Sequence, residues 1–97
     1  MRVLVLAGTG DGQAVAQALR ASGLEVVESV AGRTAAARGR AVHEGVRVGG
    51  FGGADGLAAW MREQDVGAVV DATHPFAQRM TANAVEACTR AGVPVAR

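Results

Sequence analysis

The sequence predicts an α/β fold with a doubly wound parallel sheet of about five strands in the order 3-2-1-4-5. Short apolar runs rich in β-branched residues alternate with segments of helical spacing along the chain. The first run is apolar throughout, which is typical of a strand buried on both faces of a parallel sheet. Glycines follow several of the runs, where a strand must turn into a helix. This rhythm is typical of βαβ units with right-handed crossovers.

The first strand is expected at residues 3–6 and is followed by a glycine-rich segment at residues 8–12. The helix that comes next, over residues 13–21, has apolar residues at helical spacing. We expect Gly23 to end this helix as its C-cap. A second strand over residues 25–30 then continues the alternation.

Residues 35–45 are rich in Ala, Arg and Gly without a clear period, which indicates a loop or a poor helix. A short third strand at residues 46–48 leads into the glycine-rich segment 49–53. Asp55 is expected to cap the helix that comes next. The inner face of that helix carries Leu57, Ala58 and Met61.

The fourth strand is expected at residues 67–71, and Pro75 fits the first turn of the helix after it. That helix should run to about Ala91, with Gly92 ending it. Four residues spaced by four share one side of it: Phe76, Met80, Ala84 and Cys88. A fifth strand is expected at residues 93–96.

Composition argues against nucleic-acid and membrane partners. Only 3% of the 97 residues are aromatic, and base-stacking surfaces need aromatic platforms. A net charge of +1 creates no large field to attract nucleic acid or an anionic membrane. The apolar start is too short for a signal peptide, and no run reaches the ~20 apolar residues of a membrane span. We therefore expect a cytoplasmic protein.

Cys88 is the single cysteine, which excludes an internal disulfide and a zinc cluster built on cysteines. No metal site is expected. We interpret Cys88 as a small buried hydrophobic residue on a helix.

The glycine-rich segment after the first strand resembles the dinucleotide-binding fingerprint. Gly8, Thr9 and Gly10 supply its first two glycines, but Gln13 stands at the third position. The segment lies between a strand and a helix, where free N–H groups and the helix dipole favour a pyrophosphate. The alternative is a tight turn that uses glycine for backbone freedom. Asp11 is better explained as a helix cap than as a ligand contact.

The end of the second strand bears on which nicotinamide cofactor binds. Domains that prefer NAD place an acid there for the ribose hydroxyls, but this chain places Arg33 and Thr34. An arginine can pair with the 2′-phosphate of NADPH, and Glu28 lies inside the strand rather than at its tip. We predict NADPH as the cofactor. The alternative is that Arg33 is a solvated loop charge, as we expect for Arg47.

Four consecutive residues follow the fourth strand at the predicted switch point of the sheet: Thr73, His74, Pro75 and Phe76. Ligands of open α/β sheets bind in that crevice, so we expect these residues to line the nicotinamide end of the cleft. His74 is the candidate catalytic residue, because its unperturbed pKa lies near neutrality and it could donate a proton. The alternative is a structural helix start, which Thr73 could cap equally well.

Four segments together resemble the precorrin-6A reductase family and its cobalt-precorrin-6A counterpart. They are Gly8-Thr9-Gly10-Asp11, Ala31-Gly32-Arg33-Thr34, Val48-Gly49-Gly50-Phe51-Gly52-Gly53 and Asp71-Ala72-Thr73-His74-Pro75-Phe76-Ala77. The last two are the distinctive ones, and the likeness covers nearly all 97 residues. The chain departs from the family pattern at Ala7, where a second glycine is more usual, and at Gly12.

The resemblance implies NADPH-dependent reduction of one double bond in a polycarboxylated corrin precursor of cobalamin biosynthesis. Hydride would come from the cofactor, and the protein would orient it. Family members have a second α/β domain, and substrate binds between the two. We therefore expect residues 1–97 to be one Rossmann-like NADPH-binding domain, the N-terminal part of a longer enzyme, that is inactive alone. Apolar surface exposed at residues 93–96 would favour a dimer.

Other functions fit the same fold. The end of the fourth strand also resembles dihydrodipicolinate reductases, which place a Thr-x-Pro turn beside the nicotinamide. A short-chain dehydrogenase fits less well. A non-catalytic nucleotide-sensing domain would keep the glycine-rich segment but would have no use for His74 at the crevice. Fold analogy alone does not separate these functions.

Overall fold

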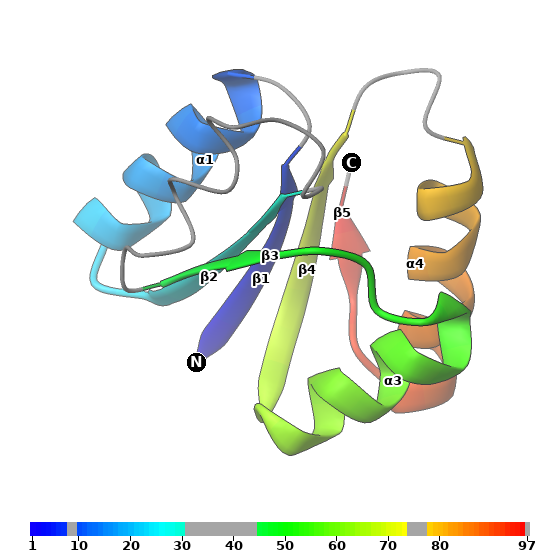
Figure 1. The fold of residues 1–97 in the computed structure, drawn as a ribbon. Helices are drawn as coiled ribbons and strands as arrows, with labels where there is room; N and C mark the ends of the chain where they lie inside the picture. Colours follow the sequence, from blue (N-terminus) through cyan, green and yellow to red (C-terminus); the bar gives the residue numbers. More distant parts are fainter. Residues whose placement is uncertain (8–9, 31–44, 74–77, 97) are drawn as a thin grey trace.

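The computed structural model describes residues 1–7, 10–30, 45–73 and 78–96. Within these ranges, five parallel strands form one sheet in the order β3-β2-β1-β4-β5, with helices on both faces (Figure 1). The elements are β1 (Arg2–Ala7), α1 (Gly10–Ala21), β2 (Glu25–Val30), β3 (Val46–Val48), α3 (Gly53–Glu63), β4 (Val66–Ala72), α4 (Gln78–Ala91) and β5 (Val95–Ala96). The predicted fold class and strand order are confirmed.

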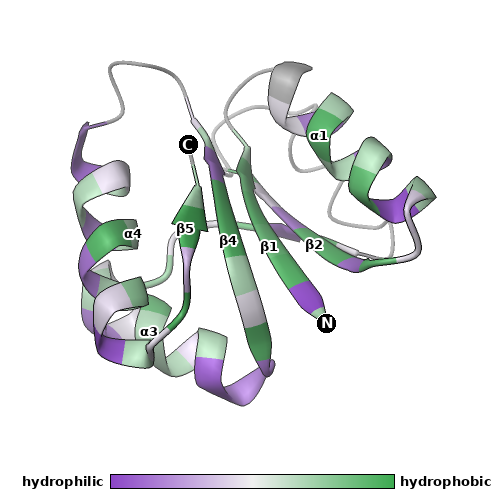
Figure 2. Ribbon diagram, turned by 180° about the vertical axis from the view of Figure 1, so that it is seen from behind, coloured by the Kyte–Doolittle hydropathy of each residue, from purple (hydrophilic) through white to green (hydrophobic). Residues whose placement is uncertain are grey.

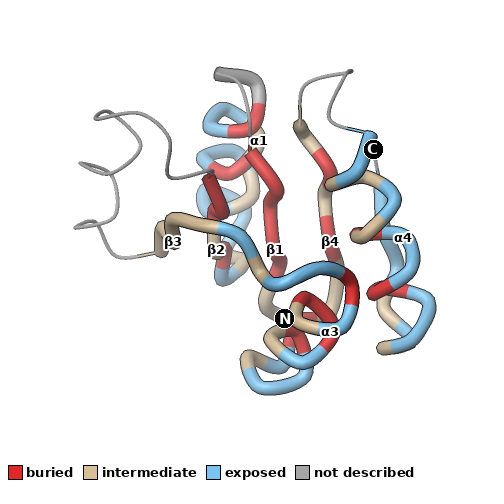
Figure 3. Tube along the Cα trace, turned by 45° about the vertical axis from the view of Figure 1, so that its right-hand side comes forward, coloured by how far each residue is buried: buried red, intermediate tan, exposed pale blue. Residues whose placement is uncertain are grey.

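The central strand β1 is buried on both faces, as its unbroken apolar sequence predicts. Val3 and Val5 face α1, where they form a core cluster with Ala16 and Val26. The alternate residues of β1 face α3 and α4 and join a second cluster. Its buried members are Leu4, Leu6, Leu57, Ala58, Met61, Val66, Val69, Ala84, Ala87 and Cys88. Figure 2 shows the hydrophobic colour along most of β1, and Figure 3 shows that strand as buried along nearly its whole length.

Two helices end in the same glycine motif. Gly23 after α1 has φ 90°, and Gly92 after α4 has φ 69°. In each case the residue after the glycine donates its N–H to a carbonyl five residues back: Leu24 to Leu19 and Val93 to Cys88. These bonds define the Schellman motif, which satisfies carbonyls left free at a helix end. The predicted glycine ends are confirmed.

The predicted N-cap role of Asp55 is wrong. The N-cap of α3 is Gly52, in the left-handed conformation with φ 84° and ψ 43°, and it makes no side-chain capping bond. The glycine-rich segment thus starts the helix at Gly53, which places Asp55 inside its first turn. There its carboxylate pairs with Arg90 of α4. A negative charge in the first turn still interacts favourably with the helix dipole.

Cys88 lies in the core between α4 and the sheet, as predicted, with 2% of its surface exposed. Burial raises the pKa of its thiol. Ala84 is fully buried one turn earlier, and Met80 packs against the same cluster. The predicted partner Phe76 lies outside the described residues.

Among the described residues, no helix is long and apolar enough to span a membrane.

Candidate functional site

The carboxyl ends of β1 and β4 lie side by side, with Ala7 paired to Ala72. From this point α1 crosses one face of the sheet, whereas α4 crosses the other (Figure 1). Divergence of this kind defines the topological switch point, where open α/β sheets bind their ligands. The switch point that the sequence predicts is therefore present, at the edge formed by the ends of β1 and β4.

The first turn of α1 packs directly against this edge through Gly12. A Cβ atom at Gly12 would lie 2.7 Å from Ala7 Cβ, 2.9 Å from Ala7 Cα and 3.6 Å from Ala72 Cβ. Only glycine fits that space, and close helix–strand packing is the role of the third glycine in the dinucleotide fingerprint. Sequence reasoning missed this by reading the third position at Gln13. The signal was the third glycine of the Gly8-x-Gly10-x-Gly12 spacing.

The N-terminus of α1 therefore opens at the carboxyl edge of β1. The helix begins at Gly10, and the N–H groups of its first turn have no partner inside the helix. These donors and the positive end of the helix dipole favour an anion such as a phosphate. The buried small residues Ala7 and Gly12 keep side chains out of the way of such an approach.

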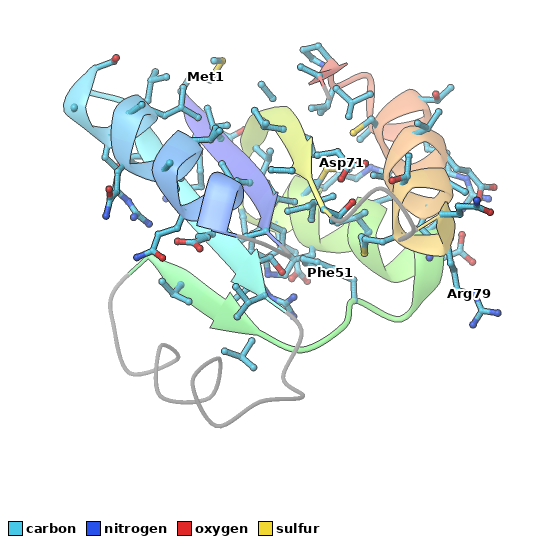
Figure 4. The ribbon with its side chains drawn as sticks, turned by 90° about the horizontal axis from the view of Figure 1, so that it is seen from above. Met1, Phe51, Asp71 and Arg79 are labelled. Atoms are coloured by element: carbon cyan, nitrogen blue, oxygen red, sulfur yellow. The ribbon has the colours of Figure 1, made fainter. Side chains whose placement is uncertain are left out.

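At the end of β4, on the other side of this edge, Asp71 accepts hydrogen bonds from the residues that follow the strand. Its Oδ1 accepts hydrogen bonds from the Thr73 N–H at 3.1 Å and from the Thr73 hydroxyl at 2.6 Å. Its Oδ2 accepts one from the Thr81 hydroxyl of α4 at 2.6 Å. Asp71 is 4% exposed and lies between β4 and α4 (Figure 4).

This cluster connects the end of β4 to the first turn of α4. It holds residue 73 at one end of the connection and Thr81 beyond its other end. Sequence reasoning assigned no role to Asp71. The signal was the Asp-x-Thr spacing, which is typical of an Asx turn closed by a side-chain carboxylate.

Arg47 plays a similar part at the end of β3, so the prediction of a solvated loop charge is wrong. Its guanidinium donates to Ser29 Oγ at 3.4 Å, to the Gly49 carbonyl at 3.0 Å and to the Gly50 carbonyl at 3.2 Å. It also stacks 3.8 Å from the centroid of the Phe51 ring. Partial burial lowers the pKa of Arg47 from its ordinary value.

The glycine-rich segment after β3 needs its glycines for backbone conformation. Gly49, Gly52 and Gly53 have φ of 108°, 84° and 75°, in the region that side chains disfavour. Phe51, between them, packs edge-to-face on Trp60 of α3 with ring centroids 5.3 Å apart. The segment is thus held between Arg47 and α3.

The described ranges include two of the predicted site residues. Gly10 begins α1 at the carboxyl end of β1, and Thr73 follows β4 at the adjacent strand end, so the two lie on the same edge. The other predicted residues lie outside the described ranges: Gly8, Thr9, Arg33, Thr34, His74, Pro75 and Phe76. Their roles stay predictions.

Comparison with protein families assigns the chain. Residues 2–97 match the family model described as Precorrin-6x reductase CbiJ/CobK. The chain belongs to this family. The resemblance seen in the sequence is thereby confirmed.

Individual members of the precorrin-6x reductase family show the same relationship. A precorrin-6A reductase of Rhodococcus erythropolis is 51% identical over 96 residues, and one of Mycobacterium tuberculosis is 49% identical over 94. A cobalt-precorrin-6A reductase of Priestia megaterium is 33% identical over 95 residues. The chain spans 38%, 37% and 37% of these proteins, respectively.

A solved structure of a family member has the same fold. The precorrin-6A reductase CobK aligns with 98% of this chain at a TM-score of 0.86 and 45% sequence identity. The aligned region covers 37% of that protein.

Proposed function

We propose that this chain is the NADPH-binding domain of a precorrin-6A reductase of cobalamin biosynthesis. The observation that carries the proposal is the switch-point edge, where Gly12 brings the N-terminus of α1 against Ala7 and Ala72. Family membership supports the reaction, because the relatives named above are precorrin-6A reductases. It also favours this reaction over a dihydrodipicolinate reductase or a nucleotide-sensing domain.

The substrate we propose is precorrin-6A without cobalt. The relatives named precorrin-6A reductase are 44% to 51% identical to the chain. Those named cobalt-precorrin-6A reductase are 33% to 38% identical. The greater likeness is to the first group.

The described edge fits a dinucleotide. Gly8, Thr9 and Gly10 would hold the pyrophosphate, where the free N–H groups of α1 face the carboxyl end of β1. Arg33 and Thr34, which follow β2 by a few residues, would hold the 2′-phosphate. The fit rests on the close contact of Gly12 with Ala7 and Ala72, which leaves no room for a Cβ and brings the N-terminus of α1 to the carboxyl end of β1.

The nicotinamide end of the cofactor would lie beside the end of β4. When bound, NADPH supplies a hydride that adds to one carbon of the substrate double bond, and a proton completes the reduction at the other. Thr73, Pro75 and Phe76 would line this end, and His74 would supply the proton. The Asp71 cluster supports that placement, since it holds Thr73 at the switch point.

Calorimetric titration with NADPH and with NADH tests the cofactor assignment. We expect NADPH to bind more tightly, and Arg33→Ala to remove the preference. Loss of one charge-assisted phosphate contact is worth about 1.5–3 kcal/mol, or roughly tenfold to a hundredfold in affinity. Arg62→Ala is the control, because Arg62 is exposed on α3. Equal affinities, or a preference unchanged in Arg33→Ala, would contradict the proposal.

A further inference from the structure

The Asp71 cluster determines which way the Thr73 hydroxyl can bond. Among the described residues, three donors converge on the Asp71 side chain: the Thr73 N–H, the Thr73 hydroxyl and the Thr81 hydroxyl. This arrangement suits a carboxylate, which only accepts hydrogen bonds. Thr73, just after β4, donates to one carboxylate oxygen and Thr81 of α4 donates to the other, so the carboxylate is held from both sides.

A threonine hydroxyl has one proton to donate and two lone pairs that accept. The proton of Thr73 is given to Asp71 over 2.6 Å, the length of a strong bond between a hydroxyl and a charged oxygen. Thr73 Oγ1 can therefore only accept any further hydrogen bond. Because the side chain is only half-buried, a ligand at the edge can reach it. That ligand group must be a donor, so a phosphate is excluded as its partner.

We propose that Thr73 Oγ1 accepts a hydrogen bond from the carboxamide amine of the nicotinamide, and that Asp71 is a positioning residue that imposes this polarity. The inference rests on the proposed function, which places the nicotinamide at the end of β4. The carboxamide carries an amine that donates at one end and an oxygen that accepts at the other. An acceptor-only Thr73 therefore selects one of the two carboxamide orientations. A carboxamide held in this way fixes how the ring lies against the sheet.

Two cofactor analogues test how much the carboxamide amine contributes to binding. The 3-acetylpyridine analogue of NADP⁺ has a methyl group in place of the amine, whereas the thionicotinamide analogue keeps the amine and replaces the oxygen by sulfur. We expect the acetylpyridine analogue to bind about twofold to tenfold more weakly than NADP⁺, the effect of one hydrogen bond. The thionicotinamide analogue should bind within about twofold of NADP⁺. Calorimetric titration of the wild-type chain measures both ratios without any variant.

Variants then assign the effect to Thr73. Thr73→Val removes the acceptor and should bring the affinity ratio of NADP⁺ to the acetylpyridine analogue close to one, and Thr73→Ser should restore it. Asp71→Ala should lower the ratio as well, because the Thr73 hydroxyl then loses the acceptor that fixes the direction of its proton. Thr89→Val is the matched control. Thr89 lies on the exposed side of α4, and its hydroxyl donates to the Val85 carbonyl.

The outcomes separate this inference from the function on which it rests. A chain that binds no NADP⁺ overturns the proposed function and this inference together. A chain that binds NADP⁺ but binds the acetylpyridine analogue equally well overturns the inference alone. A weaker thionicotinamide analogue beside a normal acetylpyridine analogue also overturns it, because Thr73 would then donate to the carboxamide oxygen.

Discussion

Gly12 shows how a missing side chain can shape a binding edge. The glycine lets the first turn of α1 rest on the end of β1, and the same contact brings the free N–H groups of the helix beside the switch point. The nearest atoms to an added Cβ include Ala7 Cα, which belongs to the backbone of the central strand. The strand is buried on both sides and has little room to move.

Gly12→Ala should therefore destabilise the fold. We expect a loss of about 1–3 kcal/mol in the free energy of unfolding, the usual cost of overpacking. NADPH affinity should fall as well, because α1 must shift away from the edge. Urea denaturation measures the first effect and calorimetry the second. Gly50→Ala is the control, since nothing lies within 4 Å of its added Cβ and its change should stay within about 0.5 kcal/mol. Equal stability of the two variants would contradict this account.

At the scale of elements, a polar side chain on each side of β1 holds the carboxyl edge of the sheet by hydrogen bonds. We call these two sets of contacts, made by Arg47 and by Asp71, clamps. Ser29 and Arg47 lie in register with Leu6 on one side, and Asp71 lies in register with it on the other. Arg47 bonds to the segment after β3, and Asp71 bonds to the residues after β4. Each clamp thus holds the chain that leaves its own strand.

Arg47→Met tests the first clamp. The variant keeps most of the stem that packs on Phe51 but removes the donors to Ser29 Oγ and to two backbone carbonyls. We expect a loss of about 1–2 kcal/mol in stability, since some of these acceptors can turn to water. The fluorescence of Trp60, the one tryptophan, should shift because Phe51 packs on it. Arg62→Met, on the outside of α3, should leave both nearly unchanged, and a similar effect of the two variants would argue against a clamp.

At the scale of the whole molecule, alkaline pH reports on the packing between α4 and the sheet. Burial raises the pKa of the Cys88 thiol, so the folded chain holds this proton more tightly than the unfolded chain. Stability from this group is present at neutral pH and declines as pH rises past about 8.5, the ordinary thiol value. The chain has no lysine and no tyrosine to obscure the effect.

We therefore expect the urea midpoint to fall between about pH 8.5 and pH 10 in the wild type, and to fall less in Cys88→Ala. The variant controls for every other group that titrates in this range. Thiol-reactive reagents should label Cys88 only when the fold opens, because 2% of the residue is exposed. Parallel pH profiles in the two proteins would show that the thiol does not couple to folding.

The chain alone should bind NADPH without reducing precorrin-6A. It spans 38% of a relative such as the precorrin-6A reductase of Rhodococcus erythropolis, and a sheet edge supplies one wall of a cleft. Sites for small molecules normally bury 70–90% or more of the ligand surface, and a macrocycle on one wall would be poorly oriented for hydride transfer. The assay follows NADPH absorbance with purified chain and precorrin-6A. Turnover at the rate of an ordinary reductase would overturn this prediction.

Most of the fold could be predicted from local sequence patterns. Strand–helix alternation sufficed for the sheet order, because right-handed crossovers leave few arrangements for five parallel strands. Gly23 and Gly92 marked helix ends correctly, since only their own φ was needed. The N-cap prediction for Asp55 was wrong because two candidate N-cap residues, a glycine and an acid, lie close together at the N-terminus of α3. The structure has Gly52 as the N-cap in the left-handed conformation, directly after Phe51, which packs on Trp60.

By itself, the sequence determined the parallel sheet, its buried central strand, the switch point and the family of this protein, because periodicity, glycine placement and motifs are local. The tertiary structure decided the roles of Gly12, Arg47 and Asp71. Each role depends on neighbouring residues. Gly12 lies too close to Ala7 for a Cβ, Arg47 bonds to two backbone carbonyls, and Asp71 accepts the proton of a hydroxyl. Those neighbours meet only when strands and helices far apart in sequence pack at one edge.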